Sequence, residues 1–146
     1  PRIIASQIKH SAAVTVQEND PTMLSLDEVS RGFYEREKTV VFAYTAQAKG
    51  LFSKLERLGV DGISEGLRCE FICDETLRRY DVMRDIASEL GRPIGQVALA
   101  ALLCDPGLEI IPIIGGRTPE QIEDSFAALD IKLSREQFEK IMKTNK

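Results

Sequence analysis

The sequence predicts an α/β fold built on a small parallel sheet, because strand-like and helix-like segments alternate along the chain. Three short runs rich in β-branched and aromatic residues are predicted strands, at residues 2–8, 39–44 and 109–114. Segments with apolar residues at helical spacing lie between and after them. Strands that alternate with helices form parallel sheets. The length suits a single domain, and we expect residues 1–146 to form one.

The composition is that of a globular protein and excludes several other classes. Hydrophobic residues make up 43% of the chain, so it can bury enough apolar surface to offset the entropy of folding. No apolar run approaches the roughly 20 residues of a membrane-spanning helix, so we expect no membrane partner. A net charge of -4 argues against nucleic acid as the main partner, because phosphate binding needs clustered Lys and Arg. Three cysteines without disulfide spacing favour reduced thiols and a cytoplasmic location.

Capping motifs mark the starts of several predicted helices. Ser25-Leu26-Asp27-Glu28 matches a capping box, in which a hydroxyl and a carboxylate satisfy free N–H groups, and it predicts a helix to about Lys38. Thr118-Pro119-Glu120-Gln121 and Ser134-Arg135-Glu136-Gln137 match two further boxes. These motifs predict two more helices after the third strand.

The middle of the chain combines one clear pattern with one ambiguous one. Residues 74–90 have apolar residues at helical spacing, with Gly91 as a stop and Pro93 in the first turn of the next helix. Residues 51–73 contain three glycines, and they are predicted to form a long loop with one short helical piece at residues 52–57.

Candidate binding residues follow the ends of the predicted strands, where parallel α/β proteins bind ligands. Gly115-Gly116-Arg117 follows the third strand and precedes a capped helix. The glycines let the backbone approach a ligand closely, the helix start offers N–H groups, and Arg117 suits a phosphate. A turn without a ligand, with Arg117 solvated, is the alternative. Tyr44 ends the second strand and either stacks on a flat ring or belongs to the core.

The sequence gives little evidence for a metal site or for a serine nucleophile. His10 is the only histidine, and no His, Cys or carboxylate cluster has the spacing of metal ligands, so no metal site is expected. No G-x-S-x-G motif is present, which argues against a serine hydrolase of that type.

Four segments, in this order along the chain, resemble motifs of the aldo-keto reductase family. Residues 5–8 (ASQI) and 42–50 (FAYTAQAKG) are similar to its "xNQI" strand and its "AYSPLAxG" segment. Residues 95–100 (GQVALA) resemble its "AQVALAWLL" helix, and residues 111–124 resemble its last strand and cofactor loop. The family fold is a (β/α)8 TIM barrel that binds NADP(H) without a Rossmann domain. The chain is shorter than a whole barrel of about 250 residues, so the resemblance implies a partial barrel that supplies the sixth, seventh and eighth strands.

The resemblance also implies a role for each matching site residue. Gln7 would meet the nicotinamide carboxamide, and Tyr44 would stack on the nicotinamide ring. The pyrophosphate side would be lined by Thr45, Ala46, Gln47 and Gly50. The adenosine 2′-phosphate would be held by Gly115, Gly116, Arg117 and Thr118, with Gln121, Asp124 and Ser125 nearer the adenine. A preference for NADPH over NADH would rest on Arg117.

The chain departs from the family pattern in ways that limit the expected activity. Ala46 and Gln47 stand where the family has proline and leucine, which predicts a looser loop, and Ser125 replaces an asparagine. The family's catalytic Asp, Tyr, Lys and His belong to the first half of the barrel, and no position here matches that half. We therefore expect no catalytic residues and no carbonyl reduction by this chain alone. The start at Pro1-Arg2 rather than Met favours a processed or excised product.

Three functional hypotheses follow. The first is the NADP(H)-binding part of an aldo-keto reductase-like oxidoreductase. The second is a non-catalytic interaction module, because a three-stranded sheet has two edges that invite self-association or a partner supplying the missing strands. The third is an unrelated phosphate-binding domain, which would be favoured if the segments after Tyr44 and before Arg117 did not face one cleft.

Overall fold

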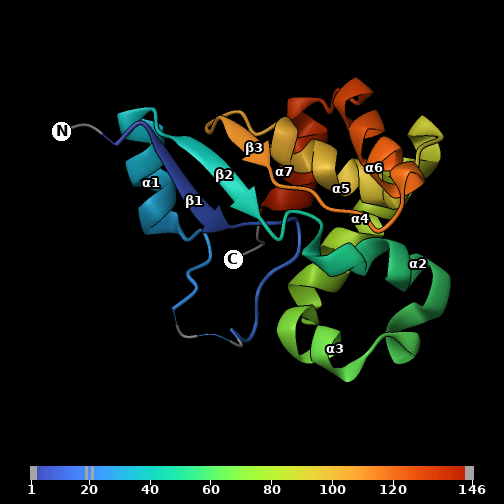
Figure 1. Cartoon of the computed structure of the whole chain (residues 1–146). Coiled ribbons are helices and arrows are strands. Elements are labelled where there is room, and N and C mark those ends of the chain that lie inside the picture. The colour runs from blue at the N-terminus through green and yellow to red at the C-terminus, as the bar shows by residue number, and fades with distance from the viewer. Residues whose placement is uncertain (1–2, 19, 21, 144–146) are drawn as a thin grey trace.

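The computed structural model describes residues 3–18, 20 and 22–143, and it shows strands and helices in alternation (Figure 1). The elements in chain order are β1 (Ala5–Lys9), α1 (Glu28–Glu37), β2 (Val40–Tyr44), the 3-10 helix η1 (Ala48–Gly50), α2 (Leu51–Gly62), α3 (Glu65–Phe71), α4 (Asp74–Leu90), α5 (Ile94–Leu103), β3 (Ile110–Pro112), α6 (Pro119–Phe126), the 3-10 helix η2 (Ala127–Asp130) and α7 (Arg135–Met142). The strands form one parallel sheet in the order β1-β2-β3. The predicted α/β class and parallel sheet are confirmed. No helix within the described ranges is long and apolar enough to cross a membrane.

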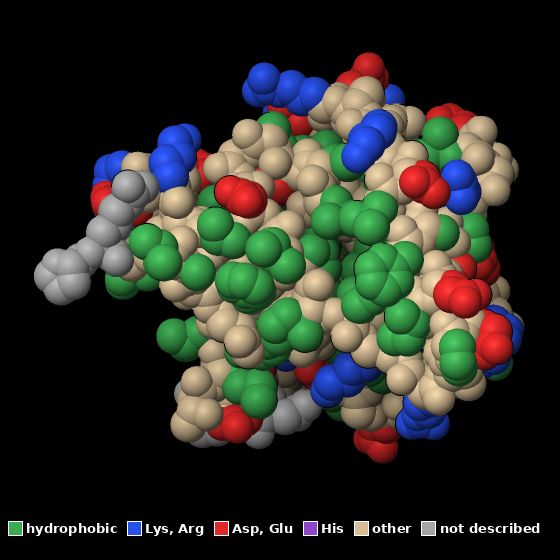
Figure 2. All heavy atoms as spheres, turned by 45° about the horizontal axis from the view of Figure 1, so that its top comes forward, with side chains coloured by type: hydrophobic (Ala, Val, Ile, Leu, Met, Phe, Trp, Pro, Cys, Tyr) green, Lys and Arg blue, Asp and Glu red, His purple; other side chains and the backbone are tan. Residues whose placement is uncertain are grey.

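The two faces of the sheet have different surroundings. Val41 and Ala43 of β2 are fully buried against the helices. Phe42 and Ile111, which pair across β2 and β3, point to the opposite face and are 36% and 42% exposed. This alternation is the two-residue period of a strand with one covered face. In Figure 2, hydrophobic side chains gather in a band across the middle of the molecule, so part of the apolar surface is open.

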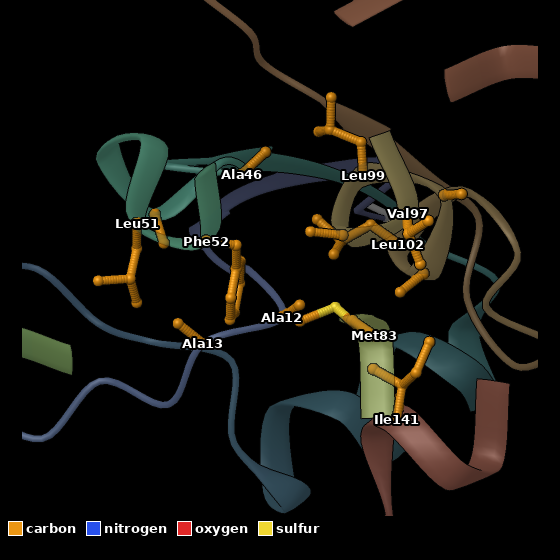
Figure 3. Packing of buried hydrophobic residues seen from close by; sticks show 14 of the residues in the cluster. Ala12, Ala13, Ala46, Leu51, Phe52, Met83, Val97, Leu99, Leu102 and Ile141 are labelled. Carbon is orange, nitrogen blue, oxygen red and sulfur yellow. The ribbon is translucent and has the colours of Figure 1, made fainter. Parts of the chain in front are cut away.

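The main core lies on the covered side of the sheet and centres on α5. Eight of the ten residues of α5 are buried, which explains why its sequence is apolar on all sides. Figure 3 shows Met83 of α4 pointing toward Ala12, and Phe52 of α2 packing on the same cluster. The core therefore joins the segment after β1 to helices from the middle of the chain.

Residues 51–73 fold into α2 and α3, so the predicted long loop is wrong, whereas the short helical piece predicted at residues 52–57 is confirmed as part of α2. Gly59, at φ 68° and ψ 178°, is non-helical and divides α2 into two helical pieces at a kink. Leu51, Phe52 and Leu55 are buried in the core, as is Phe71 of α3. A glycine within a helix destabilises the fold by about 1 kcal/mol relative to alanine. Burial of one large apolar side chain stabilises it by about 2 kcal/mol. Burial therefore outweighs the glycine content.

The start of α1 also differs from the prediction. Asp27, not Ser25, is the N-cap, and its carboxylate accepts from the Ser30 amide at 2.8 Å. The Ser30 hydroxyl accepts from the Asp27 amide at 3.1 Å and completes the capping box. Ser25 instead donates to Glu18 at 2.8 Å. The third predicted box, at the start of α7, is confirmed, with Ser134 accepting from the Gln137 amide at 3.1 Å.

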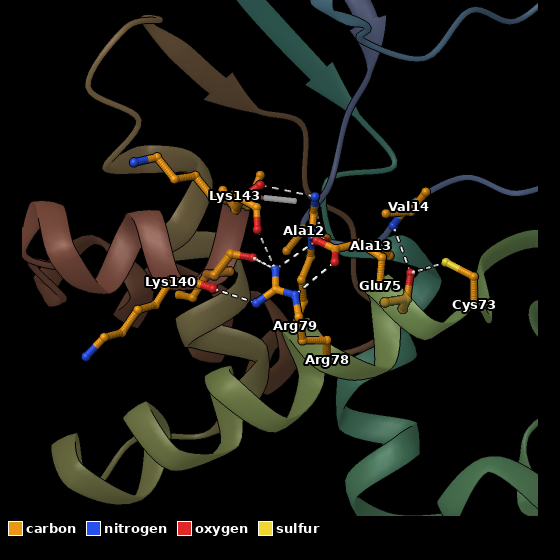
Figure 4. A network of polar contacts seen from close by, with 12 residues as sticks. Ala12, Ala13, Val14, Cys73, Glu75, Arg78, Arg79, Lys140 and Lys143 are labelled. Atoms are coloured by element: carbon orange, nitrogen blue, oxygen red, sulfur yellow. Dashed lines mark hydrogen bonds and ion pairs between the residues drawn. The ribbon is translucent and has the colours of Figure 1, made fainter. Parts of the chain in front are cut away.

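The first turns of α4 fasten the C-terminal helix and the segment after β1 (Figure 4). Arg78 donates to the carbonyl oxygen of Lys140 at 2.8 Å. Arg79 donates to the carbonyl oxygen of Ala12 at 3.1 Å. The carboxylate of Glu75 accepts from both arginines and so orients them. Three distant parts of the chain meet at this one turn.

The substitution Glu75→Gln tests this junction. Hydrogen bonds from Arg78, and those from Arg79, lower the pKa of Glu75 from 4.5 to about 2 against the opposing effect of burial. A carboxyl with a lowered folded-state pKa stabilises the fold above its unfolded pKa and loses that effect as the pH falls toward 2. We expect Glu75→Gln to lower the free energy of unfolding by about 2 kcal/mol at pH 7, measured by urea denaturation.

Glu139→Gln is the matched control. Glu139 pairs with Arg135 and Lys143 on the surface of α7, where ion pairs add little stability. We expect the deficit of Glu75→Gln to shrink between about pH 4.5 and pH 2. A deficit of the same size at pH 7 and pH 3 would contradict the role of the charged Glu75.

Candidate functional site

A cleft of about 1030 Å³ lies between the loops that follow β2 and β3. Residues 45–50 and the start of α2 form one wall, and residues 113–117 with α6 form the other. Because β2 and β3 are parallel neighbours, their carboxyl ends open at the same edge of the sheet. The fold thus brings together two loops that are far apart in the sequence.

Most of the residues singled out from the sequence line this cleft. They are Thr45, Ala46, Gln47, Gly50, Gly115, Gly116, Arg117, Gln121, Asp124 and Ser125. Gln7, Tyr44 and Thr118 lie outside its lining. Gln7 is exposed on β1 beside Phe42, and Tyr44 is half-buried, with its carbonyl oxygen accepting from the His10 amide at 3.2 Å.

The sequence reasoning missed several lining residues. They are Lys49, Ser53, Lys54, Glu56, Arg57 and Ile113. Four of them, at positions 53, 54, 56 and 57, lie in α2, within the short helical piece predicted at residues 52–57. Lys54 and Arg57 are three residues apart, so a helix places both on one face. That spacing was the available signal, and it lies inside the piece that the sequence predicts to be helical.

The loop at residues 45–50 has an unusual backbone. Positive φ angles occur at Thr45 (58°), Ala48 (46°), Lys49 (56°) and Gly50 (75°). Only glycine adopts this conformation readily, and a β-branched threonine there is exceptional. Such positions cost about 1–3 kcal/mol each and cluster at ligand sites. The backbone therefore supports a functional role for this wall of the cleft.

Hydrogen bonds join the two walls at the base of the cleft. Gln47 donates through Nε2 to Ser125 Oγ at 2.9 Å. Ser125 is 6% exposed and donates in turn to the carbonyl oxygen of Gln121 at 2.8 Å. Gln96 of α5 donates to Asp124 at 2.7 Å. The loop that was expected to be loose is thus tied to α6 by Gln47 and Ser125, two of the residues that depart from the family pattern.

The start of α6 is closed by its own side chains. Thr118 caps the helix by accepting from the Gln121 amide at 3.4 Å. The Gln121 side chain accepts from the Arg117 amide at 2.8 Å rather than from that of Thr118, so the second predicted capping box is only half formed. Because these N–H groups are already satisfied, an anion at this wall depends on the Arg117 guanidinium more than on the helix start.

A buried ion-pair cluster ties α3 to the ends of β1 and β2. Lys9 and Glu70 are each 4% exposed, and the Lys9 ammonium lies 2.9 Å from the Glu70 carboxylate. Lys49 contacts the other oxygen of Glu70, and Glu18 lies 3.0 Å from Lys9. Burial opposes both charges, but the pKa of Glu70 is lowered by its bonds from Lys49 and Lys9, and the pKa of Lys9 is raised by its carboxylate partners. The cluster stays charged and holds the positive-φ Lys49 in place.

Parallel strand–helix units with a cleft beyond the strand ends define an α/β protein, either a β/α barrel or a doubly wound sheet. The sequence model of the aldo/keto reductase family matches residues 3–146, so the chain belongs to this family. The uncharacterized oxidoreductase Rv2298 of Mycobacterium tuberculosis is 36% identical over 108 residues, which cover 70% of this chain and 32% of that protein. The uncharacterized oxidoreductase YrpG of Bacillus subtilis is 34% identical over 96 residues, which cover 66% of this chain and 29% of that protein. The chain spans about a third of the length of these relatives.

Solved structures agree with the fold. The thermostable aldo-keto reductase Tm1743 superposes with a TM-score of 0.53 at 23% identity, over 94% of this chain and 38% of that one. An aldo/keto reductase from Klebsiella pneumoniae, crystallised with NADP and acetate, gives a TM-score of 0.53 at 20% identity, over 94% of this chain and 39% of that one. The predicted partial barrel is thereby confirmed.

Proposed function

We propose that this chain is the NADP(H)-binding portion of an aldo-keto reductase-like oxidoreductase. The observation that carries the proposal is the basic cleft that residues 45–50 and 113–117 line together. Membership of the family supports it, as does the solved relative from Klebsiella pneumoniae that was crystallised with NADP. The free thiols of all three cysteines fit a reducing, cytoplasmic setting.

The residues of the cleft suit an anionic dinucleotide. Arg117 offers a planar, permanently charged group for the 2′-phosphate. Gly116 packs against α6 so closely that an added Cβ would lie 3.0 Å from Gln121 and Ile122. Gly115 meets nothing within 4 Å and leaves room beside the ligand. The remaining roles implied by the resemblance, for Gln7 and Tyr44 at the nicotinamide, are part of the same proposal.

We expect the chain to bind the cofactor without reducing a carbonyl by itself. The bound cofactor supplies a hydride in the parent reaction, whereas a separate acid must protonate the carbonyl oxygen. Among the described residues that line the cleft there is no tyrosine or histidine to serve as that acid. Purified chain with NADPH and an aldehyde is expected to show no loss of nicotinamide absorbance, and enzyme-dependent turnover would refute this part of the proposal.

Titration with NADPH, followed by nicotinamide fluorescence, tests cofactor binding. We expect saturable binding, and we expect Arg117→Glu to weaken it about 10- to 100-fold, because a charge-assisted bond is lost and repulsion is added. Arg92→Glu is the control, since Arg92 is exposed and outside the cleft. Absence of binding at millimolar NADPH, or equal binding by the Arg117 variant, would overturn the proposal.

Association through the open sheet is a second candidate function. Phe42, Ile111 and Ile113 are exposed on one face, and β1 and β3 form the edges of the described sheet. Exposed edges and apolar faces invite pairing with another polypeptide, either a second copy or one that supplies further strands. Size-exclusion chromatography with mass measurement tests this idea, and a monomer at every concentration would exclude obligate self-assembly.

A further inference from the structure

The two edges of the described sheet differ in whether they can accept another strand, and the β3 edge is blocked. Successive residues of a parallel strand direct their backbone groups alternately to one side and to the other. The Val41 amide donates to the carbonyl oxygen of Glu109 at 2.8 Å. The Ile113 amide donates to that of Ala43, also at 2.8 Å. Pro112 therefore faces the outer edge, where it has no N–H to offer a further strand.

The β1 edge, by contrast, presents backbone groups that another strand could use. Residues at even positions of β1 face β2, because the carbonyl oxygen of Ile4 accepts from β2 at 3.0 Å and the amide of His10 donates to β2 at 3.2 Å. Ala5 and Gln7 lie at odd positions and face outward. Their backbone N–H and C=O groups have no hydrogen-bond partner in the part of the chain that the structure describes. Such an edge invites pairing.

The segment that follows β1 closes this edge beyond Gln7. The Lys9 amide donates to the carbonyl oxygen of Leu24 at 3.2 Å, and the Lys9 carbonyl oxygen accepts from the Leu26 amide at 2.9 Å. This segment runs parallel to β1 and places Ser25 opposite Lys9. The open stretch is therefore short, at residues 3–7, and it contains no charged residue.

The helix that follows β1 does not cover the open stretch. Arg31 of α1 lies 2.7 Å from Asp105, which belongs to the loop before β3. Since β2 separates β3 from β1, this ion pair holds α1 toward the opposite side of the sheet. Ile4 at the edge and Leu24 beside it are largely exposed apolar residues. Apolar side chains next to unpaired backbone groups indicate an interaction surface.

A second copy of this chain is the occupant that suits the edge best. It brings an open stretch of the same length, which is equally uncharged, so neither copy has to bury an unpaired charge. Two copies that join through the same surface are related by a twofold axis, and their edge strands then run antiparallel. Antiparallel pairing also tolerates a sheet face that stays open to water, as the face with Phe42 does here.

We propose that two copies of this chain pair antiparallel through β1, with Ala5 of one copy opposite Ala5 of the other. The inference rests on the association proposed above as a second candidate function, and it names the partner and the surface. In this register Ile3 lies opposite Gln7 of the other copy, and both strands stay clear of Leu24. Because Pro112 blocks the β3 edge, β1 cannot join β3 of a further copy, and assembly closes at a dimer.

Size-exclusion chromatography with light-scattering mass measurement, over a wide range of concentration, tests the dimer. Ala5→Pro removes the N–H at the centre of the pairing, and a proline at the first residue of an edge strand is compatible with the fold. We expect it to raise the dissociation constant of the dimer about tenfold or more. Ala5→Val keeps the N–H and is the matched control, which should dimerise like the unaltered chain. Far-ultraviolet circular dichroism confirms that each variant is folded.

A cysteine at the twofold axis tests the register directly. Opposed residues of an antiparallel pair have Cα atoms about 5.5 Å apart or closer, within the range of about 4.4–6.8 Å that a disulfide spans. We expect Ala5→Cys to form a covalent dimer with oxidised glutathione, seen by non-reducing gel electrophoresis. The unaltered chain, with its three native cysteines, gives the background. Ile111→Cys, on the open face beside the blocked edge, should not exceed it.

The possible outcomes separate this inference from the two candidate functions. A monomer at every concentration would overturn both the inference and the association. A dimer that survives Ala5→Pro, a cross-link through Ile111→Cys instead, or assemblies that keep growing with concentration would overturn the inference alone. The cleft lies beyond the ends of β2 and β3, away from the outer edge of β1 (Figure 1). Ala5→Pro should therefore bind NADPH like the unaltered chain, and a failure of both to bind would refute only the cofactor proposal.

Discussion

Replacement of Glu70 by alanine is expected to lower the free energy of unfolding by about 3 kcal/mol, measured by urea denaturation at pH 7. Glu70 accepts from Lys9, which is 4% exposed and lies at the end of β1. Without this carboxylate, the buried ammonium keeps Glu18, at 3.0 Å, as its one carboxylate partner among the described residues. An incompletely paired charge in a protein interior is strongly destabilising, because it has left water without full compensation.

The double variant Lys9→Met/Glu70→Leu separates the lost charge balance from lost packing. It removes both buried charges and leaves apolar side chains, and methionine packs well on an aromatic ring. The Lys9 ammonium already lies 5.3 Å from the Phe71 ring centre, so a partner for the methionine is present. We expect the double variant to regain at least half of the loss. A loss below about 1 kcal/mol in Glu70→Ala, or a double variant no more stable than the single one, would contradict this reasoning.

The protein is expected to lose about 3 kcal/mol of stability between pH 6.5 and pH 4 through His10 alone. Burial lowers the pKa of His10 from 6.5 to about 4, Asp105 opposes this shift, and the cations Arg31 and Arg79 add to it. His10 Nε2 is buried and has no hydrogen-bond partner among the described residues. Because the unfolded chain takes up the proton first, stability is full above pH 6.5 and falls until the folded protein is also protonated near pH 4.

The substitution His10→Phe should remove this pH dependence. At pH 5 the unaltered protein should be about 2 kcal/mol less stable than at pH 7, whereas the variant should change little over that range. The contribution of Glu75 is lost only between its unfolded-state pKa of 4.5 and its folded-state pKa of about 2, so it does not interfere between pH 5 and pH 7. His10 is the only histidine, so its imidazole signal in a proton NMR titration can be assigned directly. A measured pKa near 6.5, or equal pH profiles, would contradict the prediction.

The strands and the parallel sheet could be predicted because their signals are local. The run at residues 39–44 is apolar and β-branched throughout, and helices follow each strand. Beyond the short helical piece at residues 52–57, the helices of residues 51–73 could not be predicted, because local glycine content argued for a loop. Only the complete core shows that Leu51, Phe52 and Leu55 are buried, and that their burial stabilises the fold by more than the glycines destabilise the helices.

The candidate site also has one part that the sequence predicts and one part that it does not. The strand-end positions, including Gly115 and Arg117, follow from the rule that ligands bind beyond the carboxyl ends of parallel strands. Lys54 and Arg57 of α2 were missed although they lie within the predicted helical piece, because only the folded chain shows that this helix borders the loop after β3. The bond from Gln47 to Ser125 joins residues 78 positions apart, and no local pattern reports such a contact.

The strand pairings also determine how the chain must fold. Ala5 pairs with Val40, and Val41 pairs with Ile110, so no strand can begin by forming a hairpin with its neighbour in sequence. The entropy of closing such long loops slows nucleation, and parallel sheets of this kind form late. We therefore expect α4 and α5, which are joined by the short link at residues 91–93, to form first during folding. Refolding should be slow, and its intermediates, with strands still unpaired, are the species most prone to aggregate.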